Sequence, residues 1–89
     1  MNLAPWRVEL TRAATRDLRR LDPPIRQRVQ TALQALAANP QQPSALRKLT
    51  GAPEHRLRIG DWRALLLLDT QARTITVTRV LPRGRAYRD

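Results

Sequence analysis

The first part of the chain changes from one hydrophobic spacing to another. Trp6, Val8 and Leu10 alternate with charged residues, which predicts a half-buried strand over residues 6–10. After Thr11, a typical N-cap residue, apolar side chains recur at helical intervals instead. The sequence therefore predicts a strand followed by a short amphipathic helix, whose apolar positions are Ala14, Leu18 and Leu21.

A second helix is predicted directly after the first. Asp22 followed by Pro23 is a start signal, because proline at the first helical position gives up only an N–H group that lacks an intrahelical partner. The helix should end near Asn39-Pro40, and its buried stripe is Ile25, Val29, Leu33 and Leu36. So short a connection predicts that the two helices form an antiparallel hairpin.

Strand patterns fill the second half of the chain. Residues 39–53 are rich in proline and glycine and are interpreted as a connection. Three strands follow, at about 54–60, 62–69 and 74–81, with short turns that favour antiparallel pairing. The run of leucines at 65–68 is apolar on both faces, which predicts a central strand.

These elements predict an α+β fold in the order β-α-α-β-β-β. An antiparallel sheet of about four strands should carry the N-terminal helix hairpin on one face, and the other face should be concave and partly open. Because 89 residues can bury only one sizeable core, we expect a single domain over residues 1–89.

The net charge of the chain indicates what kind of molecule it binds. Seventeen basic residues, all but one of them arginine, stand against seven acidic ones and give a net charge of +10. Such a balance favours a polyanion, although a coding bias from lysine to arginine would explain part of it. The chain has no cysteine and one histidine, so we expect no metal site and no cofactor. It shows no secretory signal and no membrane-spanning run, and a cytoplasmic location is the default.

Arginines gather on one face of the predicted strands. Alternation places Arg56 and Arg58 side by side, about 7 Å apart along the backbone, and Leu57 on the opposite face. Arg63, after the next turn, can join them, and an anion between these like charges would stabilise the cluster. His55 shares the face of Leu57, so a structural or surface role is favoured over general-base catalysis.

The C-terminal segment adds further donors and one aromatic ring. Arg83 and Tyr87 can close the cluster, since a phenol offers both a hydroxyl and a stacking face. The alternative is that Tyr87 covers the edge of the core and that Arg85 and Arg88 form a solvated tail.

The chain as a whole resembles the RelE family of bacterial toxins from toxin–antitoxin pairs. The resemblance extends over nearly all of the sequence. It rests on Trp6-Arg7-Val8, Ala14 to Leu21, Asn39-Pro40, Lys48-Leu49-Thr50-Gly51, Arg56 to Arg63, and Val80, Arg83 and Tyr87.

The resemblance implies a ribosome-dependent endoribonuclease that cuts messenger RNA in the ribosomal A site. Attack by the ribose 2′-hydroxyl needs no metal where preorganised guanidinium groups stabilise the charge that develops on the phosphate. The catalytic positions implied are Arg56, Arg58, Arg63, Arg83 and Tyr87. Contacts to RNA or the ribosome are expected from Arg12, Arg16, Arg19, Lys48, Arg85 and Arg88. The implied partners are messenger RNA, the ribosome and a cognate antitoxin, with operator DNA reached only through the antitoxin complex and no membrane.

Three positions depart from the family pattern in two ways. Relatives often carry lysine where this chain has Arg56 and Arg58, and histidine where it has Pro82. Arginine is a poor proton acceptor, which leaves Tyr87 as the candidate for proton transfer. Two other functions remain open: a toxin of the related ParE kind, which inhibits DNA gyrase without a catalytic site, and a catalytically decayed RNA-binding homologue.

Overall fold

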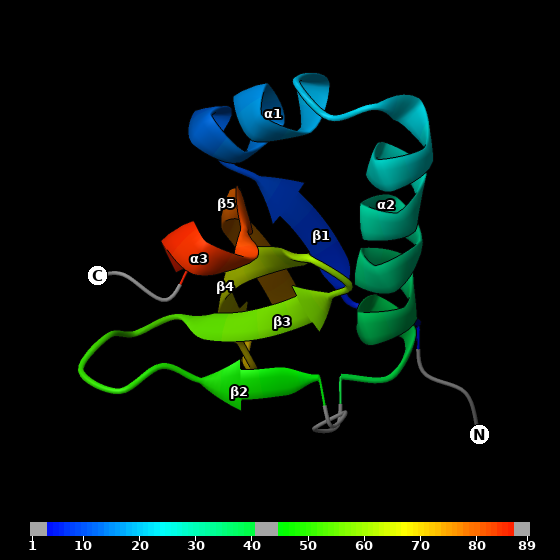
Figure 1. Cartoon of the computed structure of the whole chain (residues 1–89). Helices are drawn as coiled ribbons and strands as arrows, with labels where there is room; N and C mark the ends of the chain where they lie inside the picture. Colours follow the sequence, from blue (N-terminus) through cyan, green and yellow to red (C-terminus); the bar gives the residue numbers. More distant parts are fainter. Residues whose placement is uncertain (1–3, 41–44, 87–89) are drawn as a thin grey trace.

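A computed structural model describes residues 4–40 and 45–86 and shows one sheet with helices packed around it (Figure 1). The elements in chain order are β1 (Arg7–Leu10), α1 (Arg12–Arg19), α2 (Pro23–Ala38), β2 (Leu46–Lys48), β3 (His55–Ile59), β4 (Trp62–Asp69), β5 (Thr74–Pro82) and α3 (Arg83–Ala86). The predicted α+β fold and the order of its main elements are confirmed.

The sheet has five strands in the order β1-β5-β4-β3-β2. Neighbouring strands from β2 to β5 are antiparallel, whereas β1 pairs with β5 in parallel, so the sheet is mixed rather than wholly antiparallel. The additional strand, β2, lies in the segment 39–53, for which the sequence predicts only a connection. β4 has strands on both sides, as the leucine run predicts.

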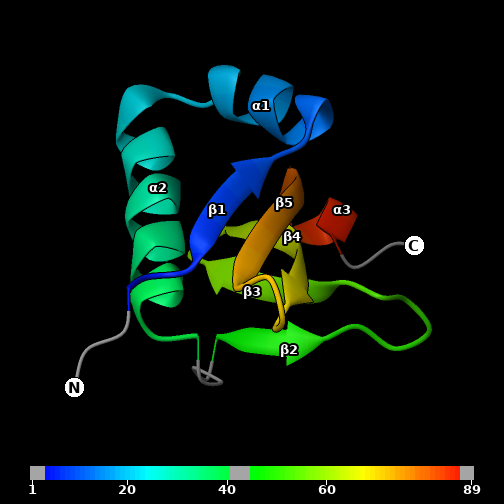
Figure 2. The ribbon, with the colours of Figure 1, turned by 180° about the vertical axis from the view of Figure 1, so that it is seen from behind.

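The two long helices begin where the sequence predicts. Thr11 caps α1, because its Oγ1 accepts the Ala14 N–H at 3.1 Å, and α2 starts with proline. α1 lies across the end of α2 (Figures 1 and 2), so the pair is more open than an antiparallel hairpin. Arg26 fixes this corner by donating to the carbonyls of Leu18, in the last turn of α1, and Leu21, in the connection to α2, at 3.1 and 3.0 Å.

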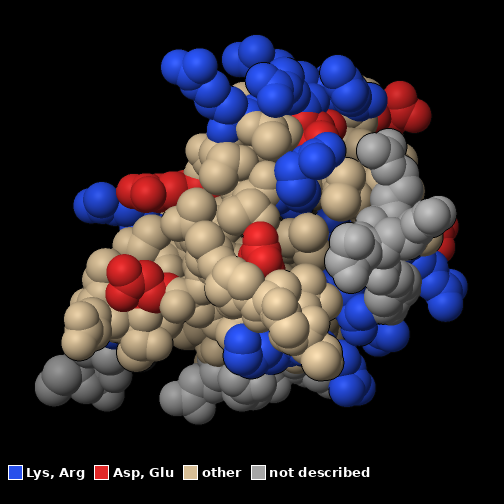
Figure 3. Space-filling view, turned by 90° about the vertical axis from the view of Figure 1, so that its left-hand side faces the viewer, with Lys and Arg blue, Asp and Glu red and all other residues tan. Residues whose placement is uncertain are grey.

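The core lies between these helices and one face of the sheet. Its largest fully buried side chains are Leu66, Ile75, Val29, Val77 and Val80. The opposite face, seen in Figure 3, carries neither α2 nor another long helix in the described part of the chain; the short α3 contacts β4 and β5, and Asp17 of α1 reaches Arg79 at the β5 side (Figures 1 and 2). None of the helices in the described part of the chain is long and apolar enough to cross a membrane.

Candidate nucleic-acid interface

The strand register brings the predicted arginines together on the sheet face away from α2. Arg58 lies directly opposite Arg63, and Arg56 lies opposite Leu65 on the same face. Leu57, between the two β3 arginines, is 4% exposed and points into the core. The alternation inferred from the sequence is therefore confirmed at the level of strand pairing.

Arg63 is buried rather than presented to solvent. Its side chain is 2% exposed, and its Nη1 donates to the Gly60 and Trp62 carbonyls at 2.9 and 2.8 Å. These carbonyls lie on either side of Asp61 at the β3–β4 turn, where Gly60 has the left-handed φ of 59° that glycine tolerates and Trp62 begins β4. Arg63 thus stabilises the turn that joins β3 to β4. The sequence pattern did not indicate this structural role.

Arg83, the first residue of α3 directly after β5, lies at the same turn. Its backbone N–H donates to the Asp61 carbonyl at 2.9 Å, directly after Pro82 pairs with Trp62. Its side chain and that of Arg58 are exposed, whereas Arg56, one row further along the sheet, is half-buried. Three of the five predicted catalytic residues, Arg58, Arg63 and Arg83, therefore meet at one end of the β3–β4 hairpin.

The C-terminal candidates lie largely beyond the described residues. Tyr87 and Arg88 fall outside them, and Arg85 is described only by its backbone in α3. Their catalytic or RNA-binding roles remain predictions from the sequence.

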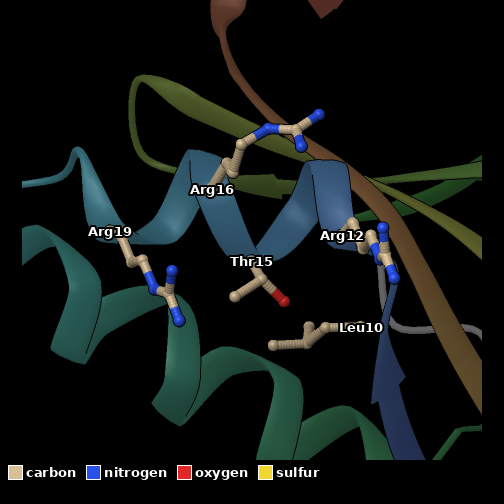
Figure 4. Close-up of a pocket in the computed structure, with 5 residues that line it drawn as sticks. All are labelled: Leu10, Arg12, Thr15, Arg16 and Arg19. Atoms are coloured by element: carbon tan, nitrogen blue, oxygen red, sulfur yellow. The ribbon is translucent and has the colours of Figure 1, made fainter.

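The predicted RNA-binding arginines of α1 form a separate basic region. Arg12, Arg16 and Arg19 line a pocket with Leu10 and Thr15. Figure 4 shows Arg12 and Arg19 on the side of α1 that faces β1 and α2, and Arg16 pointing away from it. In Figure 3 the basic side chains at the top of the view, over α1, stand apart from those near the lower edge.

Lys48 and His55 face the other side of the sheet. They pair with each other in register, on the face opposite Arg56, and Lys48 Nζ donates to the Ala52 carbonyl at 3.3 Å. His55 Nδ1 is buried and has no hydrogen-bond partner among the described residues. Burial and, to a smaller extent, the charge of Lys48 lower the pKa of His55, so the ring is neutral at neutral pH.

Two further arginines on the open face were not predicted as site residues. Arg47 on β2 lies opposite Arg56, and Arg79 on β5 lies opposite Leu65. The signal for Arg79 was present in the sequence. Strict alternation from Ile75 and Val77 would put Arg79 in the core. The pairing of β5 with β4 must therefore change register before Arg79, and it does so between Leu65 and Leu66.

Asp17 of α1 holds Arg79 in place. Its carboxylate accepts Arg79 Nε at 2.8 Å, Arg79 Nη2 at 3.2 Å and the Val80 N–H at 2.9 Å. Burial alone would raise the pKa of Asp17, but the hydrogen bonds from Arg79 and Val80, with the charges of Arg79 and Arg20, together lower it. The same carboxylate raises the pKa of Arg79.

The chemistry available on this face is binding and electrostatic stabilisation of phosphate. Guanidinium groups donate in a planar fork that fits phosphate oxygens, and they stay charged at any physiological pH. Among the described residues, no group of three His, Asp or Glu side chains could hold a metal ion.

Comparisons with known proteins identify the relatives of this fold. The family described as "ParE toxin of type II toxin-antitoxin system, parDE" matches residues 8–87. No curated protein matches the sequence. Among solved structures, the RelBE2 toxin–antitoxin complex of Mycobacterium tuberculosis contains a chain that is 28% identical, with a TM-score of 0.81 and coverage of 92% of this chain and 95% of that one.

Two more distant structures show the same fold. A chain of the archaeal RelE–RelB complex of Pyrococcus horikoshii is 23% identical, with a TM-score of 0.78 and coverage of 92% of this chain and 99% of that one. The isolated RelE toxin of E. coli is 16% identical, with a TM-score of 0.74 and coverage of 86% and 83%. With the family match over most of its length, the chain belongs to the ParE toxin family of type II toxin–antitoxin systems, within the RelE/ParE superfamily.

Proposed function

We propose that this toxin is a ribosome-dependent endoribonuclease that cleaves messenger RNA in the A site. The observation that carries the proposal is the meeting of Arg58 of β3, Arg63 of β4 and Arg83, the first residue of α3, at the β3–β4 turn. Likeness to the toxin–antitoxin complex from M. tuberculosis supports it.

The reaction is attack of a ribose 2′-oxygen on the adjacent phosphorus. The new P–O bond closes a cyclic phosphate, the bond to the 5′-oxygen breaks, and that oxygen leaves as a hydroxyl. Exposed Arg58 and Arg83 would stabilise negative charge on the phosphoryl oxygens, while buried Arg63 keeps the turn between them in shape. Tyr87 or a ribosomal group would carry the proton, because arginine does not release one at neutral pH.

We also propose that a cognate antitoxin holds the toxin inactive. The net charge of +10 favours an acidic partner, and the similar chains from M. tuberculosis and P. horikoshii were solved in toxin–antitoxin complexes. Operator DNA would be reached only through that complex.

Inhibition of DNA gyrase is the second candidate, and the match to the ParE family favours it. One pair of assays separates the two functions. The purified toxin is added to ribosomes carrying a defined messenger with an empty A site, and primer extension maps any new 3′ ends. In parallel, the same preparation is added to a gyrase supercoiling reaction. Cleavage with normal supercoiling supports the first proposal; intact messenger with blocked supercoiling refutes it in favour of the second.

A decayed, RNA-binding homologue predicts neither effect. Arg58→Gln is the matched test of the site within the first assay, since the side chain is exposed and its loss should not disturb the fold. A variant that cleaves like the parent would show that the arginines at the turn are not the catalytic groups.

A further inference from the structure

A row of arginines crosses the open face of the sheet beside the proposed catalytic turn. In register, Arg47 on β2 pairs with Arg56 on β3, Arg56 pairs with Leu65 on β4, and Leu65 pairs with Arg79 on β5. Neighbouring strands are about 4.8 Å apart, so the backbone positions span about 14 Å. The row runs perpendicular to the strands and lies next to the row that contains Arg58 and Arg63.

The environment of Arg79 distinguishes it from an ordinary surface arginine. Its side chain is 41% exposed, whereas the Asp17 side chain is 10% exposed, so the pair presents its guanidinium outward and keeps its carboxylate inside. Asp17 engages the Nε and Nη2 edge of the guanidinium. Nη1 has no hydrogen-bond partner in the described part of the chain, and its two N–H groups remain available.

Asp17 is itself fixed by the fold. It also accepts the N–H of Val80, which follows the register change between β4 and β5. Thr11 adds a second link between the same elements, because its Oγ1 donates to the Thr78 carbonyl at 2.9 Å. The Arg79 guanidinium is therefore held in one orientation before any ligand arrives, which reduces the entropy lost on binding.

We propose that Arg47, Arg56 and Arg79 form a phosphate-binding row for single-stranded RNA, with Asp17 as the positioning residue for Arg79. The substrate class rests on the proposed function. The row carries the RNA backbone across the sheet, next to the arginines that would act on the scissile phosphate. The half-buried Leu65, between Arg56 and Arg79, offers an apolar surface to a base or ribose.

Binding of a short, labelled, single-stranded RNA to the full chain tests the row without requiring cleavage. Arg79→Gln is compared with Arg28→Gln, which removes the same charge from an exposed position on α2. Losing a charge-assisted contact should weaken binding by about tenfold. It should also reduce the slope of log K against log salt concentration by about 0.7, while Arg28→Gln changes the slope less. Equal effects of the two substitutions would overturn the row.

Asp17→Asn tests the positioning role against simple neutralisation. This variant and Asp22→Asn each raise the net charge from +10 to +11 by removing one carboxylate, and Asp22 is exposed without a side-chain capping bond. Neutralisation predicts tighter RNA binding for both variants. Positioning predicts weaker binding for Asp17→Asn alone. If Asp17→Asn binds as tightly as Asp22→Asn, Asp17 does not position Arg79.

A substitute variant and a separate cleavage assay make the outcome unambiguous. Should Asp17→Asn fail to fold, Arg79→Lys replaces it: this variant keeps the charge and loses the fork, so binding as tight as the parent's would contradict the need for an oriented guanidinium. Failure of the proposed function has a different signature. A toxin that does not cut messenger on ribosomes, but whose RNA binding depends on Arg79, would lose the nuclease proposal and keep the row.

Discussion

Replacing Arg63 with methionine should unfold the toxin more easily, not only inactivate it. The substitution keeps a long side chain but removes the Nη1 donor to the Gly60 and Trp62 carbonyls. A hydrogen bond from a charged group contributes about 1.5–3 kcal/mol, and Gly60 lies at the exposed turn, where water can replace part of the loss. We therefore expect the free energy of unfolding to fall by about 2–3 kcal/mol. In a domain of this size, the midpoint temperature of thermal unfolding should drop by roughly 10–20 °C.

The assay pairs thermal unfolding with toxicity on induction, and Arg58→Met is the matched control. Arg58 lies directly opposite Arg63 but is exposed, so its substitution should change stability by no more than about 0.5 kcal/mol while still reducing toxicity. If Arg63→Met melted like the parent and was inactive, Arg63 would act in the chemistry and not in the fold. Loss of toxicity on substituting Arg63 therefore becomes evidence for catalysis only after its stability is known.

Three further predictions concern stability, each read from urea unfolding. Thr11→Val should lower the unfolding free energy by about 2 kcal/mol, because it removes the helix cap and the bond to the Thr78 carbonyl; Thr31→Val, at an exposed position in α2, should cost far less. The pKa of Asp17 is lower in the folded chain, so its contribution is complete above about pH 4 and disappears as the pH falls through the folded value. If the free energy of unfolding of Asp17→Asn fell with decreasing pH as steeply as that of the parent, this prediction would be wrong. The pKa of His55 is also lower in the folded chain, so protons favour the unfolded state below about pH 6.5; stability that does not fall there, or falls equally in His55→Gln, would refute it.

Local periodicity predicted the elements that pack on the core. The two-residue turn at Gly60-Asp61 was enough to predict that Arg63 joins the cluster of Arg56 and Arg58, and the structure pairs Arg63 with Arg58, because a tight hairpin fixes its own register. β2 was missed because three residues among prolines and glycines show no alternation. The parallel direction of β1 was missed too, because pairing with β5 joins segments far apart in sequence and leaves no local trace.

The properties that decide function arise from contacts of this long-range kind. The alternation of side chains along each strand predicts which face of the sheet carries the arginines. It cannot distinguish one arginine from another, whereas the fold gives them different environments. Arg63 is buried on the turn carbonyls, Arg58 is exposed, and Arg79 is oriented by a carboxylate 62 positions away.

These differences bear on the choice between the two toxin activities. A surface that only binds a protein needs no guanidinium held in advance, because rim charges contribute mainly to encounter rates. Stabilising a phosphate as charge develops on it does require fixed donors, since the gain comes from preorganisation. The structure contains such an arrangement: Asp17 accepts hydrogen bonds from one edge of the Arg79 guanidinium, and Arg63 stabilises the neighbouring β3–β4 turn. If Asp17→Asn slowed messenger cleavage while leaving antitoxin affinity unchanged, the preorganisation would belong to the nuclease. If it weakened only antitoxin binding, the arginine face would be an inhibitor-binding surface, and gyrase would become the target to pursue.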